Sequence, residues 1–240
     1  MFQKTSINWL FIIICVVMLF AGCSSLNTET DLLECDAATM THFPYTDNGV
    51  IVVKHQECTP VADIPGLTRI ETFYVNEGKP ITVRAYEMCR TEIKVQDTIA
   101  WSLQPSSTSG RLDWVLPVTE GFAKENYLGM NNTDYGGGIP MIDVWQRNGG
   151  VAIGLIEPVL RTISMPIEWK RYDDKISMAL RYEFEHPVTL NTGDTLHTFS
   201  AFRYEHTGDY FNALRTFSEV MQQEAGIQLP ASEPEAFEPV

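Results

Sequence analysis

The strongest constraint on the fold is an alternation of apolar and polar residues over 176–185. Successive side chains of a β-strand point to opposite faces of its sheet, so a period of two indicates a strand with one buried face. The apolar positions of this run are Ile176, Met178, Leu180, Tyr182 and Phe184. The turn signal Asn191-Thr192-Gly193-Asp194 separates it from a second alternating run, 196–205. The two runs therefore predict a β-hairpin.

Short apolar segments of this kind recur along most of the chain, and turn residues separate them. The segments are 50–54, 68–75, 81–95, 99–103, 114–118, 141–145, 151–156 and 163–169. So many short strands, with no helices between them, predict an all-β fold. We expect a large, mostly antiparallel β-sandwich over 31–206.

One helix is predicted after the strands, over 207–228. Asp209 is a typical N-cap residue, and Gly226 followed by Pro230 is a typical end. The apolar residues that recur at helical spacing on one face are Phe211, Leu214, Phe217 and Met221. Residues 229–240 are rich in Pro and Glu and are expected to form a linker, which suggests that the chain is the front part of a longer protein.

The first 22 residues predict a signal peptide. Lys4 precedes an apolar run over 9–20, which is shorter than the roughly 20 residues of a spanning helix but fits a signal core of about 7–15 residues. The sequence Leu19-Phe20-Ala21-Gly22-Cys23 resembles the lipobox of bacterial lipoproteins. That resemblance implies lipidation of Cys23, a tether over 23–30, and a lipid-anchored position in the bacterial envelope, on a membrane side left open. A plain secretory signal and an uncleaved anchor helix are the alternatives.

Composition argues against several classes of function. The formal net charge of −14 disfavours a nucleic-acid partner, because phosphate binding needs clusters of Lys and Arg. The five His residues show no metal-binding spacing, and there is no CxxC or GxSxG motif, so neither a metal nor another cofactor is expected. Outside the cytoplasm, two of Cys35, Cys58 and Cys89 could form a disulfide, in three possible pairings.

The segment 126–147, NYLGMNNTDYGGGIPMIDVWQR, predicts a loop that leads into a strand. Sugar recognition needs a flat aromatic face for C–H edges, and polar groups for hydroxyls. The candidate sugar-binding residues in this segment are Asp134, Tyr135, Asp143 and Trp145.

Strand alternation puts Asp143 and Trp145 on one face of the strand and aliphatic residues on the other. If the aliphatic face is the core, Asp143 and Trp145 point away from it together. The alternative is a wide turn, with Trp145 packed on a second layer and Asp143 held by backbone donors.

Several motifs resemble the N-terminal region of glycoside hydrolase family 36, the melibiase or α-galactosidase-like group. They are Trp101-Ser102-Leu103-Gln104-Pro105, the DWVLPV of 113–118, the Tyr-Gly-Gly-Gly-Ile-Pro of 135–140, the VAIGLIE of 151–157 and the helix of 208–226. The resemblance implies a β-supersandwich of the galactose mutarotase-like type, a linking helix, a (β/α)₈ catalytic barrel and a small C-terminal β domain. The implied substrates are terminal α-galactosides.

The same resemblance implies a division of labour. The two catalytic aspartates of the family lie in the barrel, and no segment of this chain matches the nucleophile motif, so the chain alone is expected to be inactive. In some relatives the N-terminal domain lends an Asp to the sugar pocket. Asp134 is the nearest match, with Asp143 and Trp145 as rivals. The implied partners are an α-galactoside, the barrel of the same protein and a membrane. A stand-alone, non-catalytic carbohydrate-binding lipoprotein is the alternative, and a purely structural role is a third.

Overall fold

The computed structural model describes residues 37–42, 51–105, 114–128, 138–159 and 161–226, which belong to one compact unit. The predicted signal peptide, Cys23, the tether and the linker over 229–240 lie outside the described residues. Among the described residues, no helix is long and apolar enough to cross a membrane.

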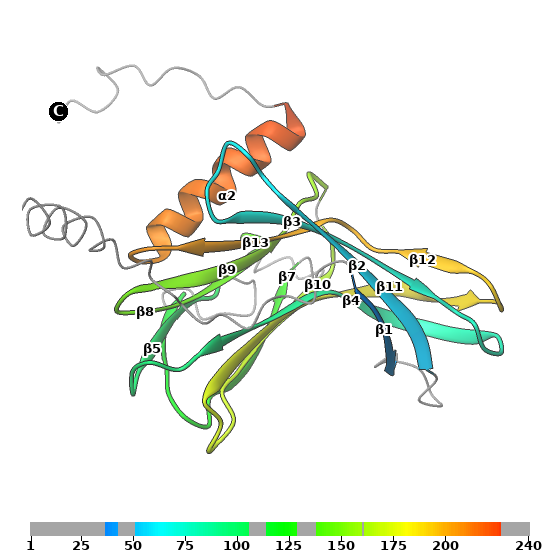
Figure 1. Ribbon diagram of the computed structural model, residues 1–240, viewed down its shortest axis with the longest axis horizontal. Coiled ribbons are helices and arrows are strands. Elements are labelled where there is room, and N and C mark those ends of the chain that lie inside the picture. Colours follow the sequence, from blue (N-terminus) through cyan, green and yellow to red (C-terminus); the bar gives the residue numbers. More distant parts are fainter. Residues whose placement is uncertain (1–36, 43–50, 106–113, 129–137, 160, 227–240) are drawn as a thin grey trace, which may run out of the picture. The chain divides into compact units, whose positions relative to one another are not determined.

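Within the described ranges, thirteen strands form two sheets and every strand pairing is antiparallel, which confirms the predicted fold class (Figure 1). The nine-stranded sheet consists, in spatial order, of β1 (Ala37–His42), β2 (Ile51–Pro60), β3 (Leu67–Val75), β13 (Ala201–His206), β9 (Gly149–Leu155), β8 (Met141–Gln146), β5 (Ala100–Leu103) and β6 (Val115–Val118), with β12 (Thr195–His197) also paired to β3. The four-stranded sheet consists of β4 (Ile81–Lys94), β11 (Lys175–Leu190), β10 (Ile163–Glu168) and β7 (Ala123–Leu128).

The alternating run 176–185 lies in β11 and buries the predicted face. Ile176, Met178 and Leu180 have no exposed surface, and Tyr182 and Phe184 pack against the same core. That core fills the space between the sheets, and its members from the opposite sheet include Ile142, Val144 and Ile153.

The predicted hairpin between 176–185 and 196–205 is wrong. Strand β11 pairs with β4 and β10, whereas β12 and β13 pair with strands of the other sheet. The chain crosses between sheets at the turn after Leu190, and the buried Asn76 holds that turn. Its Nδ2 donates to the carbonyls of Leu190 and Asn191, at 3.0 and 3.1 Å, and its own carbonyl accepts from the Gly193 N–H. The turn residues were identified correctly, but turn chemistry alone does not say which strand comes next in the sheet.

A β-bulge in β4 links the two sheets. The register with β11 skips Met88, because Leu180 lies opposite Cys89 while Arg181 lies opposite Glu87. The carbonyls of Met88 and Glu87 accept hydrogen bonds from the hydroxyls of Thr72 and Tyr74 in β3, both at 2.6 Å. Extra residues in a bulge leave backbone groups outside the strand ladder, and here the opposite sheet satisfies them.

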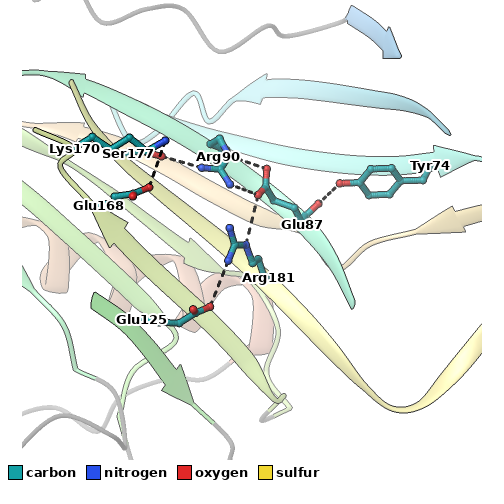
Figure 2. Close-up of polar contacts among 8 residues, drawn as sticks. All are labelled: Tyr74, Glu87, Arg90, Glu125, Glu168, Lys170, Ser177 and Arg181. Atoms are coloured by element: carbon teal, nitrogen blue, oxygen red, sulfur yellow. Dashed lines mark hydrogen bonds and ion pairs between the residues drawn. The ribbon is translucent and has the colours of Figure 1, made fainter. Parts of the chain in front are cut away.

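The same bulge explains the ion pairs on the outer face of the four-stranded sheet. Residues three apart in a regular strand point to opposite faces, but the bulge resets the alternation. Glu87 and Arg90 therefore meet, with Oε2 and Nη2 2.6 Å apart. Arg181 of β11 lies beside Glu87 and reaches Glu125 of β7 (Figure 2).

The helix α2 (Tyr210–Ala225) lies over β8, β9 and β13, on the face of the nine-stranded sheet that is turned away from the other sheet (Figure 1). Both predicted ends are confirmed. The Asp209 side chain accepts from the Phe211 N–H at 3.1 Å, and Gly226 adopts the left-handed conformation with φ 63°. The predicted apolar face is partly wrong, because Phe211 is 63% exposed. The buried helix residues are Ala213, Thr216 and Val220, with Leu214 and Phe217 packed beside them.

The cysteines are partly resolved by the structure. Cys58 is disulfide-bonded, and Cys89 is a free thiol with no exposed surface. The two pairings that involve Cys89 are therefore excluded. Burial raises the pKa of Cys89 to about 12.

Candidate functional site: an aromatic groove beside the start of the helix

Two tryptophans lie side by side where β5 and β8 run next to each other. Trp101 and Trp145 are direct cross-strand partners, so their side chains emerge on the same face of the sheet. Trp101 is 44% exposed, whereas Trp145 is half-buried against the ring of Tyr210, with ring centroids 5.4 Å apart. Phe211 stacks on Tyr210 in turn, at 4.3 Å. The arrangement gives a run of aromatic rings from β5 to the first turn of α2.

A groove of about 520 Å³ opens beside these rings. It is lined by Asp97, Thr98, Ile99, Trp101, Trp145, Gln146, Arg147, Gly208 and Asp209. The lining therefore combines two indole rings with carboxylate, guanidinium and hydroxyl groups. Aromatic faces with a few polar groups around them are typical of small-ligand sites.

Gln146 fixes the wall formed by the turn between β4 and β5. The Gln146 side chain is nearly buried and bonds to the backbone of this turn. Its Oε1 accepts from the backbone N–H groups of Gln96 and Asp97, at 2.7 and 3.0 Å, and its Nε2 donates to the Lys94 carbonyl at 2.9 Å. The Arg147 N–H donates to the Asp97 carboxylate at 3.3 Å. These bonds hold Asp97 and Arg147 next to each other at the edge of the groove.

The opposite wall is the beginning of the helix. Gly208 adopts φ 79°, a conformation that favours glycine, and the chain then enters α2 at the Asp209 cap. Asn212 donates from Nδ2 to the Thr207 carbonyl at 2.7 Å. The segment that joins β13 to the helix is thus held by a cap at one point and a side-chain amide at another.

Asp143 lies beneath the groove rather than in it. It shares a face with Trp145, as predicted, but that face is covered by α2, so Asp143 has no exposed surface. The expectation that Asp143 points away from the protein interior is therefore corrected. Its Oδ1 lies 2.9 Å from Nε2 of His206, whose side chain is also fully buried.

Both members of this buried pair have a raised pKa. Burial raises the pKa of Asp143 more than the hydrogen bond from His206 lowers it. Burial lowers the pKa of His206, but the hydrogen bond to Asp143 and its negative charge outweigh this effect, so the pKa is raised overall. Each group thus retains a proton to higher pH than it would in water.

Of the predicted sugar-binding residues, the structure assigns only Trp145 to the groove. Asp134 and Tyr135 lie outside the described residues, so their predicted roles stay predictions. Sequence reasoning missed the groove residues Asp97, Thr98, Trp101, Arg147 and Asp209 as a set. Trp101 is the second residue of β5, and no local signal predicts its pairing with Trp145, because that pairing depends on strand order. Among the described residues, no group of His, Cys, Asp or Glu side chains is arranged to hold a metal ion.

The sequence matches no protein-family model and no curated protein. Solved structures do share its fold. The GH36 α-galactosidase AgaB from Geobacillus stearothermophilus aligns with a TM-score of 0.52 and 11% identity, over 78% of this chain and 28% of its own. The α-galactosidase from Lactobacillus brevis aligns with a TM-score of 0.53 and 11% identity, over the same shares of the two chains. At this identity the likeness is one of fold, and the chain spans about 28% of the length of these enzymes.

Proposed function

We propose that this chain is the β-sandwich domain of an α-galactosidase-like glycoside hydrolase and that it supplies one wall of a sugar pocket. The bond-breaking carboxylates would belong to a separate catalytic barrel. The observation that carries the proposal is the groove with Trp101 and Trp145 on one wall, in a fold shared with α-galactosidases over 78% of the chain.

The chemistry of the groove suits a neutral sugar. Galactose presents a patch of C–H groups on one ring face, and an indole face can pack against it. Asp97 and Asp209 offer acceptors for sugar hydroxyls, and Arg147 offers donors. Trp145 is already held by Tyr210, so little side-chain freedom would be lost on binding.

A direct test is calorimetric titration of the chain with methyl α-galactoside, with methyl α-glucoside as a comparison sugar. We expect Trp145→Ala and Trp101→Ala each to weaken binding about tenfold, equivalent to about 1.4 kcal/mol. Trp114→Ala is the matched control, because Trp114 is a 39% exposed tryptophan that does not line the groove. Equal weakening by all three substitutions, or no binding at all, would contradict the assignment of the groove.

The division of labour has its own test. Retaining glycosidases need two carboxyl groups about 5–5.5 Å apart on either side of the scissile bond. We expect the chain alone to release no nitrophenol from p-nitrophenyl α-galactoside, and an in-frame barrel to restore release. Hydrolysis by the chain alone would refute the proposal.

A stand-alone sugar-binding protein is a second candidate. The exposed edge of Trp101 favours it, because a ligand can reach that ring without any further domain. Strong galactoside binding by the chain together with a native stop codon after Val240 would decide for this candidate.

We also propose that Cys23 carries a lipid that anchors the protein in a bacterial envelope. The lipobox-like Leu19-Phe20-Ala21-Gly22-Cys23 supports this. Cys23→Ala should move the protein from the membrane fraction to the soluble fraction, and unchanged membrane retention would refute the anchor.

A further inference from the structure

The buried pair beneath the groove joins its two walls. Asp143 lies in β8, two residues before Trp145 and on the same face. His206 ends β13 and is followed directly by Thr207, Gly208 and Asp209, the last two of which line the groove. The 2.9 Å contact between Asp143 and His206 therefore connects the strand that carries the indole to the segment that carries the cap.

The contacts of His206 indicate which of its bonds need a proton. Its Nδ1 faces the Thr207 carbonyl at 3.3 Å, and a carbonyl can only accept, so Nδ1 carries a hydrogen. The bond between Nε2 and the Asp143 carboxyl needs one more proton, on either partner. With that shared proton the pair is neutral overall. Without it, a negative charge remains where neither side chain has exposed surface.

Few groups nearby could compensate that charge. The titratable groups in this layer are Asp209 at the start of α2, which is itself acidic, Tyr204, whose ring lies 5.6 Å from the His206 ring, and Tyr210 of α2, which packs on Trp145. The residues opposite on β9 and β5 are Gly150, Ala152 and Leu103, which carry no charge. Among the described residues, Oδ2 of Asp143 has no hydrogen-bond partner.

We propose that Asp143 and His206 are positioning residues that hold the two walls of the groove together, and that loss of their shared proton loosens them and weakens sugar binding. This inference rests on the proposed function for its sugar. The raised pKa of His206 sets the direction of the effect. The shared proton is present at low pH, and it is lost as the pH rises through the pKa of His206 in the folded protein.

The test follows the indole N–H signal of Trp145 by NMR in the chain, from about pH 6 to pH 9, a range that begins near the ordinary pKa of His. The signal is assigned by its loss in Trp145→Phe. In the natural chain we expect the Trp145 signal to titrate and the affinity for methyl α-galactoside to fall severalfold over the same range. The Trp114 signal should not move in that titration, because Trp114 lies outside the groove lining.

Asp143→Asn tests the role of the shared proton separately from the packing of the side chain. Asn is nearly the same shape and can donate from Nδ2 to Nε2 of a neutral His206, so both bonds remain and no shared proton is left to lose. We expect this variant to bind the galactoside about as well as the natural chain at low pH, within about twofold, which is a small change in free energy. Its Trp145 signal and its affinity should no longer depend on pH.

Asp143→Ala removes the bond altogether and should shift the Trp145 signal at every pH. Asn126→Ala is a matched control for general loss of stability. Asn126 is also fully buried, and its Nδ2 donates to the Met165 carbonyl in the four-stranded sheet. That control should destabilise the chain while leaving the Trp145 titration unchanged.

Two outcomes would overturn the inference: a Trp145 signal that does not titrate in the natural chain, or one that titrates identically in Asp143→Asn. A titration that behaves as expected, with no galactoside bound at any pH, would support the positioning pair and refute the proposed sugar. The two ideas can therefore fail separately.

Discussion

The two sheets of the sandwich present very different outer faces. The outer face of the four-stranded sheet carries partly exposed ion pairs among Glu87, Arg90, Arg181 and Glu125 (Figure 2). Over β8, β9 and β13, the outer face of the nine-stranded sheet is covered by α2 and buries aromatic and aliphatic side chains, together with the Asp143–His206 pair. The first face is in contact with water, whereas helix α2 covers this part of the second face.

This difference shows where a strand pattern carries information about function. On the charged face, outward side chains are partly solvated, and we expect each ion pair to contribute little to stability. On the covered face, outward side chains become a second core, and polar groups are retained there only with a partner. The groove lies beside the first turn of α2, where the helix no longer covers the sheet. Trp101 is therefore 44% exposed to solvent.

The largest effect is expected at the centre of the covered face. Phe202 has no exposed surface and packs 5.9 Å from the ring of Phe217 in the helix. Phe202→Ala should lower the free energy of unfolding by about 3–5 kcal/mol, because a large buried ring leaves a cavity. Urea unfolding measures this loss. A loss below about 1 kcal/mol would mean that the helix is not a genuine second layer.

A smaller loss is expected from overfilling the same layer. A Cβ on Gly154 would overlap the Phe202 ring and lie 2.9 Å from Cβ of Met141. Gly154→Ala should therefore cost about 1–3 kcal/mol in unfolding free energy. The double variant Gly154→Ala, Phe202→Leu should recover part of that loss, since leucine removes the overlapping ring atoms. If the losses of the two single variants simply add in the double variant, the contact between the new Cβ and the Phe202 ring does not cause the loss in Gly154→Ala.

The helix cap should matter less. Asp209→Ala removes the side-chain acceptor for the Phe211 N–H and should cost about 1 kcal/mol. Asp209→Asn retains an acceptor of similar quality, so thermal unfolding should find it near the natural chain. Because Asp209 also lines the groove, the Asn variant tests whether its charge contributes to sugar binding independently of stability.

The smallest effect is expected on the charged face. Glu87→Gln removes the pairing with Arg90 and Arg181 and should cost less than about 1 kcal/mol, with the difference shrinking as salt is added. Galactoside binding should not change. A large loss of unfolding free energy that does not depend on salt would contradict the idea that the two faces differ in their contribution to stability.

Most of the fold was predictable because strand periodicity is a local property. The run in β11 and the cap and stop of α2 were all identified from neighbouring residues. Strand partners are not local. The chain leaves β11 for the other sheet at a turn that Asn76 holds from 115 residues away, and a hairpin was predicted instead. The bulge at Met88 was also missed, because it depends on hydroxyls from another strand.

The candidate site was less predictable for the same reason. Trp145 was identified from composition, and Asp143 was placed correctly on the face that it shares with Trp145. Helix α2 covers that face. The apolar side predicted for this helix is shifted by one residue from the side that is buried, which carries Ala213 and Thr216. With the helix rotated in this way, the burial of Asp143 and the exposure of Phe211 could not be foreseen.

The free cysteine has a consequence for the chemistry of the disulfide. Exchange between a thiol and a disulfide requires the thiolate form, and with a pKa of about 12 Cys89 holds its proton throughout the physiological range. Cys58 packs against the same core that contains Cys89, so the retained proton is what keeps this potential nucleophile inactive toward the bond at Cys58. While the two sheets stay closed, Cys89 therefore does not readily reshuffle this cross-link from within.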